Sequence, residues 1–312
     1  MRNLASLSMT SGLLPAFPDF APLSLEHGAA IEEAREQAQP EASELTFPEI
    51  FAWRRVRQTQ ITDIDGAMGL FILRHGQRCF YPPIGARDPV RTMHRMLSWL
   101  RQQGEDGFVY GLTGDVVTRV QTDDMLVAEE DVDNADYVYR VQDLIRLPGH
   151  RYDGKRNHIN HFLQNNDFTF SRLKVSEIPE LIDFENRWYT HRHRTDPPGL
   201  AAENQAILEL LRNYGNLPVE GAVVRIRGRI EAFSIATELN RNTAVVIAEK
   251  ANHEIRGLYQ AINQMFCEHF LARYTWVNRE QDTGDLGLRR AKLSYHPHHM
   301  VAKYRVRLRR SS

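Results

Sequence analysis

The chain contains a stretch in which short apolar segments alternate with polar turns before the spacing changes to that of a helix. The tight-turn pairs Asp65-Gly66 and His75-Gly76 interrupt this stretch. Met93, Met96, Leu97 and Leu100 then recur at helical spacing. The pattern predicts strands at 58–64, 67–74 and 78–84, a helix at 90–103 and a strand at 108–112.

A later stretch of the chain repeats the same order of elements without repeating the residues. It predicts strands at 219–226, 230–239, 243–249 and 274–278, with a helix around Leu258 to His269 before the last of them and a short helix at 285–293 after it. Because meander, helix and strand occur twice, we expect a duplicated α/β unit that has lost its sequence similarity.

These patterns suggest an organisation in three parts. Residues 1–24 are rich in Ser, Ala and Pro, and we expect them to be partly disordered. Residues 25–149 form the first half and residues 150–312 the second, with the join near Pro148-Gly149.

Composition narrows the class of protein. The 312 residues include 39 Lys and Arg and 40 Asp and Glu, so no global basic field attracts nucleic acid or membrane. Cys79 and Cys267 are far apart, which supports neither a disulfide framework nor a cysteine-based zinc site. No apolar run reaches signal-peptide or membrane-spanning length, so we expect a cytoplasmic protein without a transmembrane segment.

Several short polar strings in the second half resemble those of a known family. They are Gly154-Lys155-Arg156-Asn157-His158, Glu249-Lys250-Ala251-Asn252, Asn278-Arg279-Glu280-Gln281-Asp282 and the segment from Gly287 to Tyr295. Together with Asp143 to Gly149 and Tyr81 to Gly85, they make the chain similar to soluble members of the phosphatidylglycerol lysyltransferase C-terminal domain family, from about Phe20 onward.

The resemblance implies a tandem acetyltransferase-type (GNAT-like) α/β fold, with two mixed central sheets flanked by helices. In the membrane-fused relatives it implies transfer of an amino acid from aminoacyl-tRNA to a lipid headgroup. The expected donor here is therefore aminoacyl-tRNA, and the acceptor is an anionic lipid, a peptide or a small molecule. The first half, which lacks the charged strings, is expected to serve as scaffold.

Glu249 and Lys250 end a predicted strand that is otherwise apolar. Facing a cleft, Glu249 would act as a base for the acceptor and Lys250 as a charge clamp. The alternative is a structural ion pair at the strand end.

Polar residues also crowd the exit of the strand at 274–278. Asn278, Glu280 and Asp282 are catalytic candidates there, because clustered charge at a strand exit is a typical site location. Arg279 is a candidate for substrate binding. A salt-bridged, solvated surface is the alternative explanation.

The next predicted helix adds three candidates. Arg289 and Lys292 share one helix face and can hold an anionic substrate. Tyr295 is a candidate general acid, or else a packed aromatic residue.

Two helix starts offer further binding candidates. The first comprises Asn252, Arg256, Gly257 and Tyr259, where free N–H groups can bind phosphate. Glu254 and Tyr259 do not suit a coenzyme A pyrophosphate, so Arg256 is a phosphate partner for a tRNA end or a simple capping residue.

The second helix start comprises Lys155, Arg156, Asn157 and His158. Its cations oppose the helix dipole unless an anion lies between them, so the patch binds phosphate or carboxylate or is a solvated helix start.

His296, His298 and His299 lack matched carboxylates, so no metal site is predicted. The leading hypothesis is an aminoacyltransferase that needs no cofactor beyond aminoacyl-tRNA. The alternatives are an acyl-coenzyme A-dependent N-acyltransferase and a non-catalytic module that binds tRNA or a metabolite.

Overall fold

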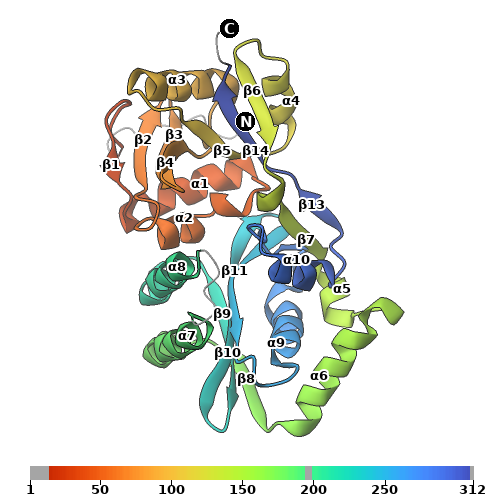
Figure 1. Ribbon diagram of the computed structural model, residues 1–312. Helices are drawn as coiled ribbons and strands as arrows, with labels where there is room; N and C mark the ends of the chain where they lie inside the picture. Colours follow the sequence, from red (N-terminus) through yellow and green to blue (C-terminus); the bar gives the residue numbers. More distant parts are fainter. Residues whose placement is uncertain (1–13, 194–198, 310–312) are drawn as a thin grey trace, which may run out of the picture. The chain divides into compact units, whose positions relative to one another are not determined.

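The computed structural model describes residues 14–193 and 199–309 (Figure 1). Contacts divide the chain into two compact units, Met1–Val132 with Ala302–Ser312, and Asp133–Val301. The division falls before the expected join near Pro148-Gly149, because residues 136–140 pair with strands of the second unit. Within the described residues, no helix combines the length and the apolar character that a membrane span requires.

The first unit contains a mixed sheet of order β1-β2-β3-β4-β5-β14-β6. Its elements are β1 (Ala21–Pro22), α1 (Gly28–Ala38), α2 (Phe47–Trp53), β2 (Gln60–Ile64), β3 (Ala67–Arg74), β4 (Gln77–Phe80), α3 (Pro89–Gln102), β5 (Phe108–Leu112), α4 (Asp115–Gln121), β6 (Leu126–Glu130) and β14 (Tyr304–Leu308).

The predicted meander is present as β2, β3 and β4. Both residues of each turn pair have positive φ, 56° and 80° at Asp65 and Gly66, and 48° and 77° at His75 and Gly76. Such turns match the twist of the flanking strands.

The segment before the meander is described from residue 14 onward. Residues 1–13 lie outside the described residues, but β1 pairs with β2. The rings of Phe17 and Phe20 lie 5.6 and 5.2 Å from that of Trp99 on α3. These two aromatic side chains supply the apolar contacts that order this segment.

The second unit contains a mixed sheet of order β13-β7-β12-β11-β10-β9-β8. Its elements are β7 (Asp136–Arg140), α5 (Val141–Arg146), α6 (Asp153–Asn165), β8 (Phe168–Arg172), α7 (Ile178–His193), α8 (Leu200–Arg212), β9 (Glu220–Ile226), β10 (Arg229–Asn240), β11 (Thr243–Ala251), α9 (Leu258–Phe266), β12 (Trp276–Asn278), α10 (Leu286–Leu293) and β13 (His299–Val301). A π-helical turn, Cys267–Leu271, continues α9.

The two sheets share one topology, which confirms the tandem acetyltransferase-type fold. In each, an antiparallel meander is followed by a helix and a parallel strand, β4 beside β5 and β11 beside β12. The strand that closes each repeat along the chain lies in the sheet formed by the other repeat: β7 lies between β12 and β13, and β14 lies between β5 and β6. The two repeats have therefore exchanged their last strands.

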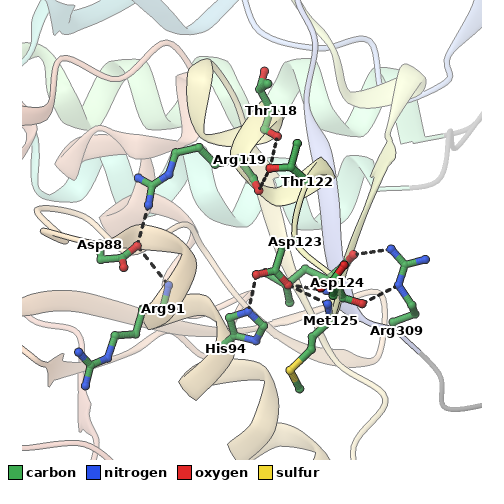
Figure 2. A network of polar contacts seen from close by, with 11 residues as sticks. Asp88, Arg91, His94, Thr118, Arg119, Thr122, Asp123, Asp124, Met125 and Arg309 are labelled. Carbon is green, nitrogen blue, oxygen red and sulfur yellow. Dashed lines mark hydrogen bonds and ion pairs between the residues drawn. The ribbon is translucent and has the colours of Figure 1, made fainter.

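The arginines of β14 and the residue after it are held by acidic side chains and carbonyl groups. Arg305 pairs with Asp131 at 2.7 Å, and Arg307 donates to the carbonyl oxygen of Asp106 at 2.9 Å. Figure 2 shows Arg309 bound to the carbonyl oxygen of Asp124, beside the pair of His94 and Asp123. These contacts account for the basic face of β14.

A buried ionic cluster lies in the first unit. Lys303 is completely buried, and its ammonium donates to Glu44 at 2.6 Å. The hydroxyl of Tyr110 donates to the other carboxylate oxygen at 2.8 Å, and Arg57 donates to the hydroxyl of Tyr81. The segment that leads into β14 is thus fixed to the core of the first unit by charge as well as by strand pairing.

Candidate functional site

The second unit has an opening in its sheet where β11 and β12 diverge. The two strands pair only from Thr243 to Val245 and from Trp276 to Asn278. Directly afterwards the register between β10 and β11 shifts, leaving Ile247 as the extra residue of a β-bulge. A bulge bends its strand, and in the described part of the chain β12 does not pair with β11 beyond Val245.

An ion pair spans this opening. Arg279, the first residue after β12, places Nη2 2.8 Å from Oε1 of Glu249 on β11. The second oxygen of Glu249 accepts from Ser234 at 3.3 Å and from Asn263 of α9 at 3.4 Å. Glu249 is thereby a partner of Arg279 and less available as a free base.

Arg279 keeps N–H donors that no described residue uses. Burial alone would lower the pKa of its guanidinium, but Glu249 raises that pKa above the ordinary value, so the group stays charged. A guanidinium carries five N–H donors, and within the described part of the chain only the bond to Glu249 uses one. The remaining donors can bind an oxyanion or a carbonyl oxygen in the opening.

Two cations, Arg279 and Lys155, lie beside one aromatic ring, that of Tyr295. The Lys155 ammonium, at the start of α6, is 4.0 Å from the centre of the Tyr295 ring, and the Arg279 guanidinium is 5.2 Å from it. Lys155 also donates to the hydroxyl of Ser294 at 2.6 Å. Two cations and one ring thus converge at the opening, with Glu249 paired to only one of them.

Lys155 combines a lowered pKa with the absence of a carboxylate partner among the described residues. Burial, together with the charge of Arg279, lowers the pKa of the Lys155 ammonium to about 8. Throughout residues 14–193 and 199–309, no carboxylate forms an ion pair with it. A lysine in this state can exchange a proton near physiological pH.

Tyr295 is a buried part of this arrangement. Burial raises the pKa of its phenol well above the ordinary value, which keeps it protonated. Its carbonyl oxygen accepts from the hydroxyl of Tyr152 at 2.9 Å, so the ring has a fixed position between the cations. The packed-aromatic interpretation and a contact with substrate are both compatible with this geometry.

Lys292 orders the loop after β12. Its ammonium donates to the carbonyl oxygens of Arg279, Glu280 and Gln281 at 2.7, 3.0 and 2.5 Å. Burial lowers the pKa of Lys292 to about 8, and all three of its donors are used by this loop. Asn278, completely buried, accepts from the backbone N–H of Glu280 at 2.7 Å and donates to Asp136 at 2.9 Å.

The ion pair of Asp282 and Arg289 anchors the loop after β12 to α10. Arg289 donates to both oxygens of Asp282, at 2.8 and 2.9 Å, and the hydroxyl of Tyr137 donates to Asp282 as well. Burial would raise the pKa of Asp282, but the hydrogen bond from Arg289 lowers it below its usual range. Asp282 therefore suits a structural role better than that of a general base.

The structure separates Lys250 from Glu249. Adjacent residues of a strand point to opposite faces, and Lys250 donates to Glu203 of α8 at 2.7 Å, with its ammonium 4.0 Å from the Trp188 ring of α7. In Figure 1, α7 and α8 lie on one side of this sheet and α9 on the other. Lys250 and Glu249 therefore do not act together in one cleft.

The predicted phosphate loop before α9 is largely occupied by protein contacts. Asn252 donates to Glu231 at 2.9 Å and accepts from the N–H of Glu254, and Tyr259 accepts from Trp188 at 3.1 Å. Arg256 is exposed, with no side-chain partner in the described part of the chain. A Cβ on Gly257 would lie 2.0 Å from the carbonyl oxygen of His158.

Gly257→Ala should destabilise the second unit by about 3 kcal/mol or more, because a φ of +88° and a backbone clash both oppose a side chain. Gly228→Ala is the matched control, since its φ is +79° and nothing lies within 4 Å of the added Cβ. Urea unfolding of both variants would separate the clash from the backbone strain. Equal losses in the two variants would mean that α6 does not constrain the start of α9.

The residues at the start of α6 differ in their contacts. Arg156 binds the carbonyl oxygens of Leu147 and Gly149 and the carboxylate of Asp153, so it holds the preceding turn. Asn157 is exposed and makes no side-chain hydrogen bond within the described residues. Among the described contacts of residues 155–158, the one to the Tyr295 ring is made by Lys155.

Sequence reasoning did not single out Ser294 or Glu185. Ser294 lies in the polar segment from Gly287 to Tyr295, and no spacing distinguishes it from its neighbours. The sequence does distinguish Glu185, because a charged residue there falls within the apolar stripe of a helix. Leu181, Phe184 and Trp188 form this stripe on α7, and all are buried. Across the described residues, no group of three His, Cys, Asp or Glu side chains is arranged to hold a metal ion.

The sheet opening and its charged rim define an acetyltransferase-type domain with a polar site at the diverging strands. Comparison with known families then identifies the chain. The family described as "Phosphatidylglycerol lysyltransferase, C-terminal" matches residues 35–307, and the protein belongs to this family.

Individual relatives agree with this assignment. A conserved protein of unknown function from Bacteroides thetaiotaomicron has a TM-score of 0.87 at 27% identity, covering 93% of this chain and 99% of that one. The C-terminal domain of a putative lysylphosphatidylglycerol synthetase from Agrobacterium fabrum has a TM-score of 0.64 at 15% identity, covering 92% and 91%. An uncharacterised protein of Mycoplasmoides gallisepticum, MYCGA3080, is 24% identical over 181 residues, which is 56% of this chain and 56% of that protein.

Proposed function

We propose that this protein is an acyltransferase that moves an aminoacyl group from aminoacyl-tRNA to a nucleophilic acceptor at the opening between β11 and β12. Family membership supports the transferase class, because the family is named for a lysyltransferase. One observation carries the placement of the site: Arg279, with spare donors, and Lys155, without a carboxylate partner, lie on the same ring of Tyr295.

Arg279 stabilises the charge that develops during the reaction. When the acceptor attacks the ester carbonyl carbon, the carbonyl oxygen becomes negatively charged. N–H donors whose positions are already fixed stabilise this oxyanion without reorganisation. The ion pair with Glu249 fixes the guanidinium, and the loop anchored by Lys292 fixes the backbone of Arg279.

Lys155 moves the proton in this scheme. In its neutral form it accepts a proton from the attacking hydroxyl or amine of the acceptor as the new bond to the carbonyl carbon forms. It then gives this proton to the ribose oxygen as the ester bond breaks, so atoms and charge balance. A pKa of about 8 suits both steps.

Charged tRNA is preferred to acyl-coenzyme A as donor because of the start of α9. The carbonyl oxygen of His158 packs against Gly257, where a pyrophosphate would need free N–H groups. A carbonyl oxygen beside a phosphate is unfavourable. Arg256 remains exposed nearby and can contact the tRNA backbone.

The test uses the purified protein with a pool of tRNAs charged with radiolabelled amino acids. Acceptors are offered separately as phosphatidylglycerol vesicles, a peptide and a small amine. We expect label to leave tRNA and appear in one acceptor, and Arg279→Met to reduce this transfer by about 100-fold or more.

Two outcomes would contradict the proposal. Binding of charged tRNA without loss of label would indicate a binding module. A higher melting temperature with acetyl-coenzyme A, together with acetylation of the small amine, would indicate the coenzyme A-dependent alternative.

A further inference from the structure

A buried carboxylate without a hydrogen-bond partner lies on the α7 side of the second sheet. Glu185 is 1% exposed, and neither of its oxygens has a partner in the described part of the chain. The side-chain oxygen of Asn204, on the neighbouring helix α8, is also buried without a partner there. Buried polar groups are normally paired, so these three vacant acceptor oxygens on neighbouring helices call for a donor.

The surrounding groups already hold one ammonium. The Lys250 Nζ donates to Glu203 at 2.7 Å and lies 4.0 Å from the Trp188 ring. The indole N–H of Trp188 donates to the carbonyl oxygen of Ala251 at 3.0 Å, which fixes the ring. A carboxylate and an aromatic face are the two features that bind an ammonium group in proteins.

The charge balance of this cluster favours binding of a second cation. Two carboxylates, Glu185 and Glu203, face one ammonium, that of Lys250. Burial raises the pKa of Glu185 to about 7; the charge of Lys250 opposes this rise and that of Glu203 adds to it. An uncompensated buried carboxylate is costly, and a second ammonium would remove that cost.

We propose that Glu185, Glu203 and Asn204 bind the primary ammonium group of a small ligand. An ammonium has three N–H donors, and the two oxygens of Glu185 and the one of Asn204 are vacant acceptors for it. The side chain of Glu203 is 43% exposed, which gives the cluster a polar route to solvent. This site goes beyond the proposed function, because α7 and α8 lie on the face of the second sheet opposite α9, which contacts Glu249. Its binding is therefore tested without transfer.

The probe is n-butylamine, with tetramethylammonium as a cation that has no N–H donor. Binding is followed at the indole N–H resonance of Trp188, one of four tryptophans, assigned with Trp188→Phe. We expect butylamine to shift this resonance and tetramethylammonium to leave it unchanged. Because binding needs ionised Glu185, the apparent Kd should fall about tenfold from pH 6 to pH 8.

Glu185→Gln keeps the shape of the side chain and removes its charge, and we expect it to weaken butylamine binding at least tenfold and to abolish the pH dependence. Asp183→Asn, an exposed residue of the same helix, makes the same charge change and should bind like the wild type. Equal binding by Glu185→Gln, or no shift in the wild type, would overturn the proposal and assign the vacant acceptors to water. Binding without any transfer activity would leave this site standing and contradict only the proposed transferase function.

Discussion

Replacing Lys303 with methionine is expected to lower the free energy of unfolding by about 3–5 kcal/mol. The side chain is completely buried against Glu44, which is 2% exposed. Burial would raise the pKa of Glu44, but the ammonium of Lys303 lowers it to about 2. Without the lysine, a buried carboxylate loses its counter-ion, and urea unfolding at pH 7 would measure the loss.

Two controls make this result specific. Glu44→Leu combined with Lys303→Met should recover much of the loss, because an apolar pair replaces the ion pair. Arg307→Ala, on the same segment but partly exposed, should change stability by less than about 1 kcal/mol. A Lys303→Met protein as stable as the wild type would show that the buried pair is energetically neutral.

The stabilisation by this pair should also depend on pH in a defined direction. The pKa of Glu44 is lowered in the folded state, so its contribution is complete above the unfolded value near 4.5 and disappears as the pH falls toward 2. Lys303→Met should therefore lose its difference from the wild type in acid.

Replacing Lys155 with methionine should reduce aminoacyl transfer by about 10²- to 10⁴-fold. The neutral amine is the active form, so wild-type activity should rise as the pH passes about 8 and then level off. The variant should lack this rise, and Lys155→Arg should not restore it because a guanidinium stays charged. Initial rates from pH 6 to pH 9.5 with saturating charged tRNA would measure both effects.

Asn157→Ala is the neighbouring control, since this exposed side chain has no hydrogen bond within the described residues. It should transfer at the wild-type rate. A Lys155→Met protein that keeps both rate and pH profile would remove Lys155 from the proton transfer, even if the transferase assignment holds.

The elements and their repetition were predictable because they depend on short-range patterns. Asp65-Gly66 and His75-Gly76 specify their turns locally, and Met93 to Leu100 specify the buried stripe of α3. The position of β14 was not predictable, because its partners, β5 and β6, lie almost two hundred residues earlier in the chain. Alternation along the strand does predict a solvated basic face, but not the acidic partners that each arginine finds.

The candidate site was likewise predictable in its position along the chain but not in its contacts. The sequence located the charged cluster at the exit of β12, and the opening lies there. It could not show that Lys292 would use its donors on backbone carbonyls, or that Arg289 would bind both oxygens of Asp282. These contacts depend on how a loop folds over a helix, and no spacing rule encodes that. The one missed signal was Glu185, a charge within an apolar helical stripe.

The exchange of last strands bears on how the protein folds as it leaves the ribosome. Until residues 304–308 have been made, β5 and β6 lack the strand that lies between them, and each has an unpaired edge. At about 5–20 residues per second, synthesis from β6 to β14 takes on the order of 10–30 s. The second unit contains no residue beyond Val301, so it can be completed before the first. The sheet of the first unit can therefore be completed only after the second unit has been synthesised, and until then its unpaired strand edges can be bound by chaperones.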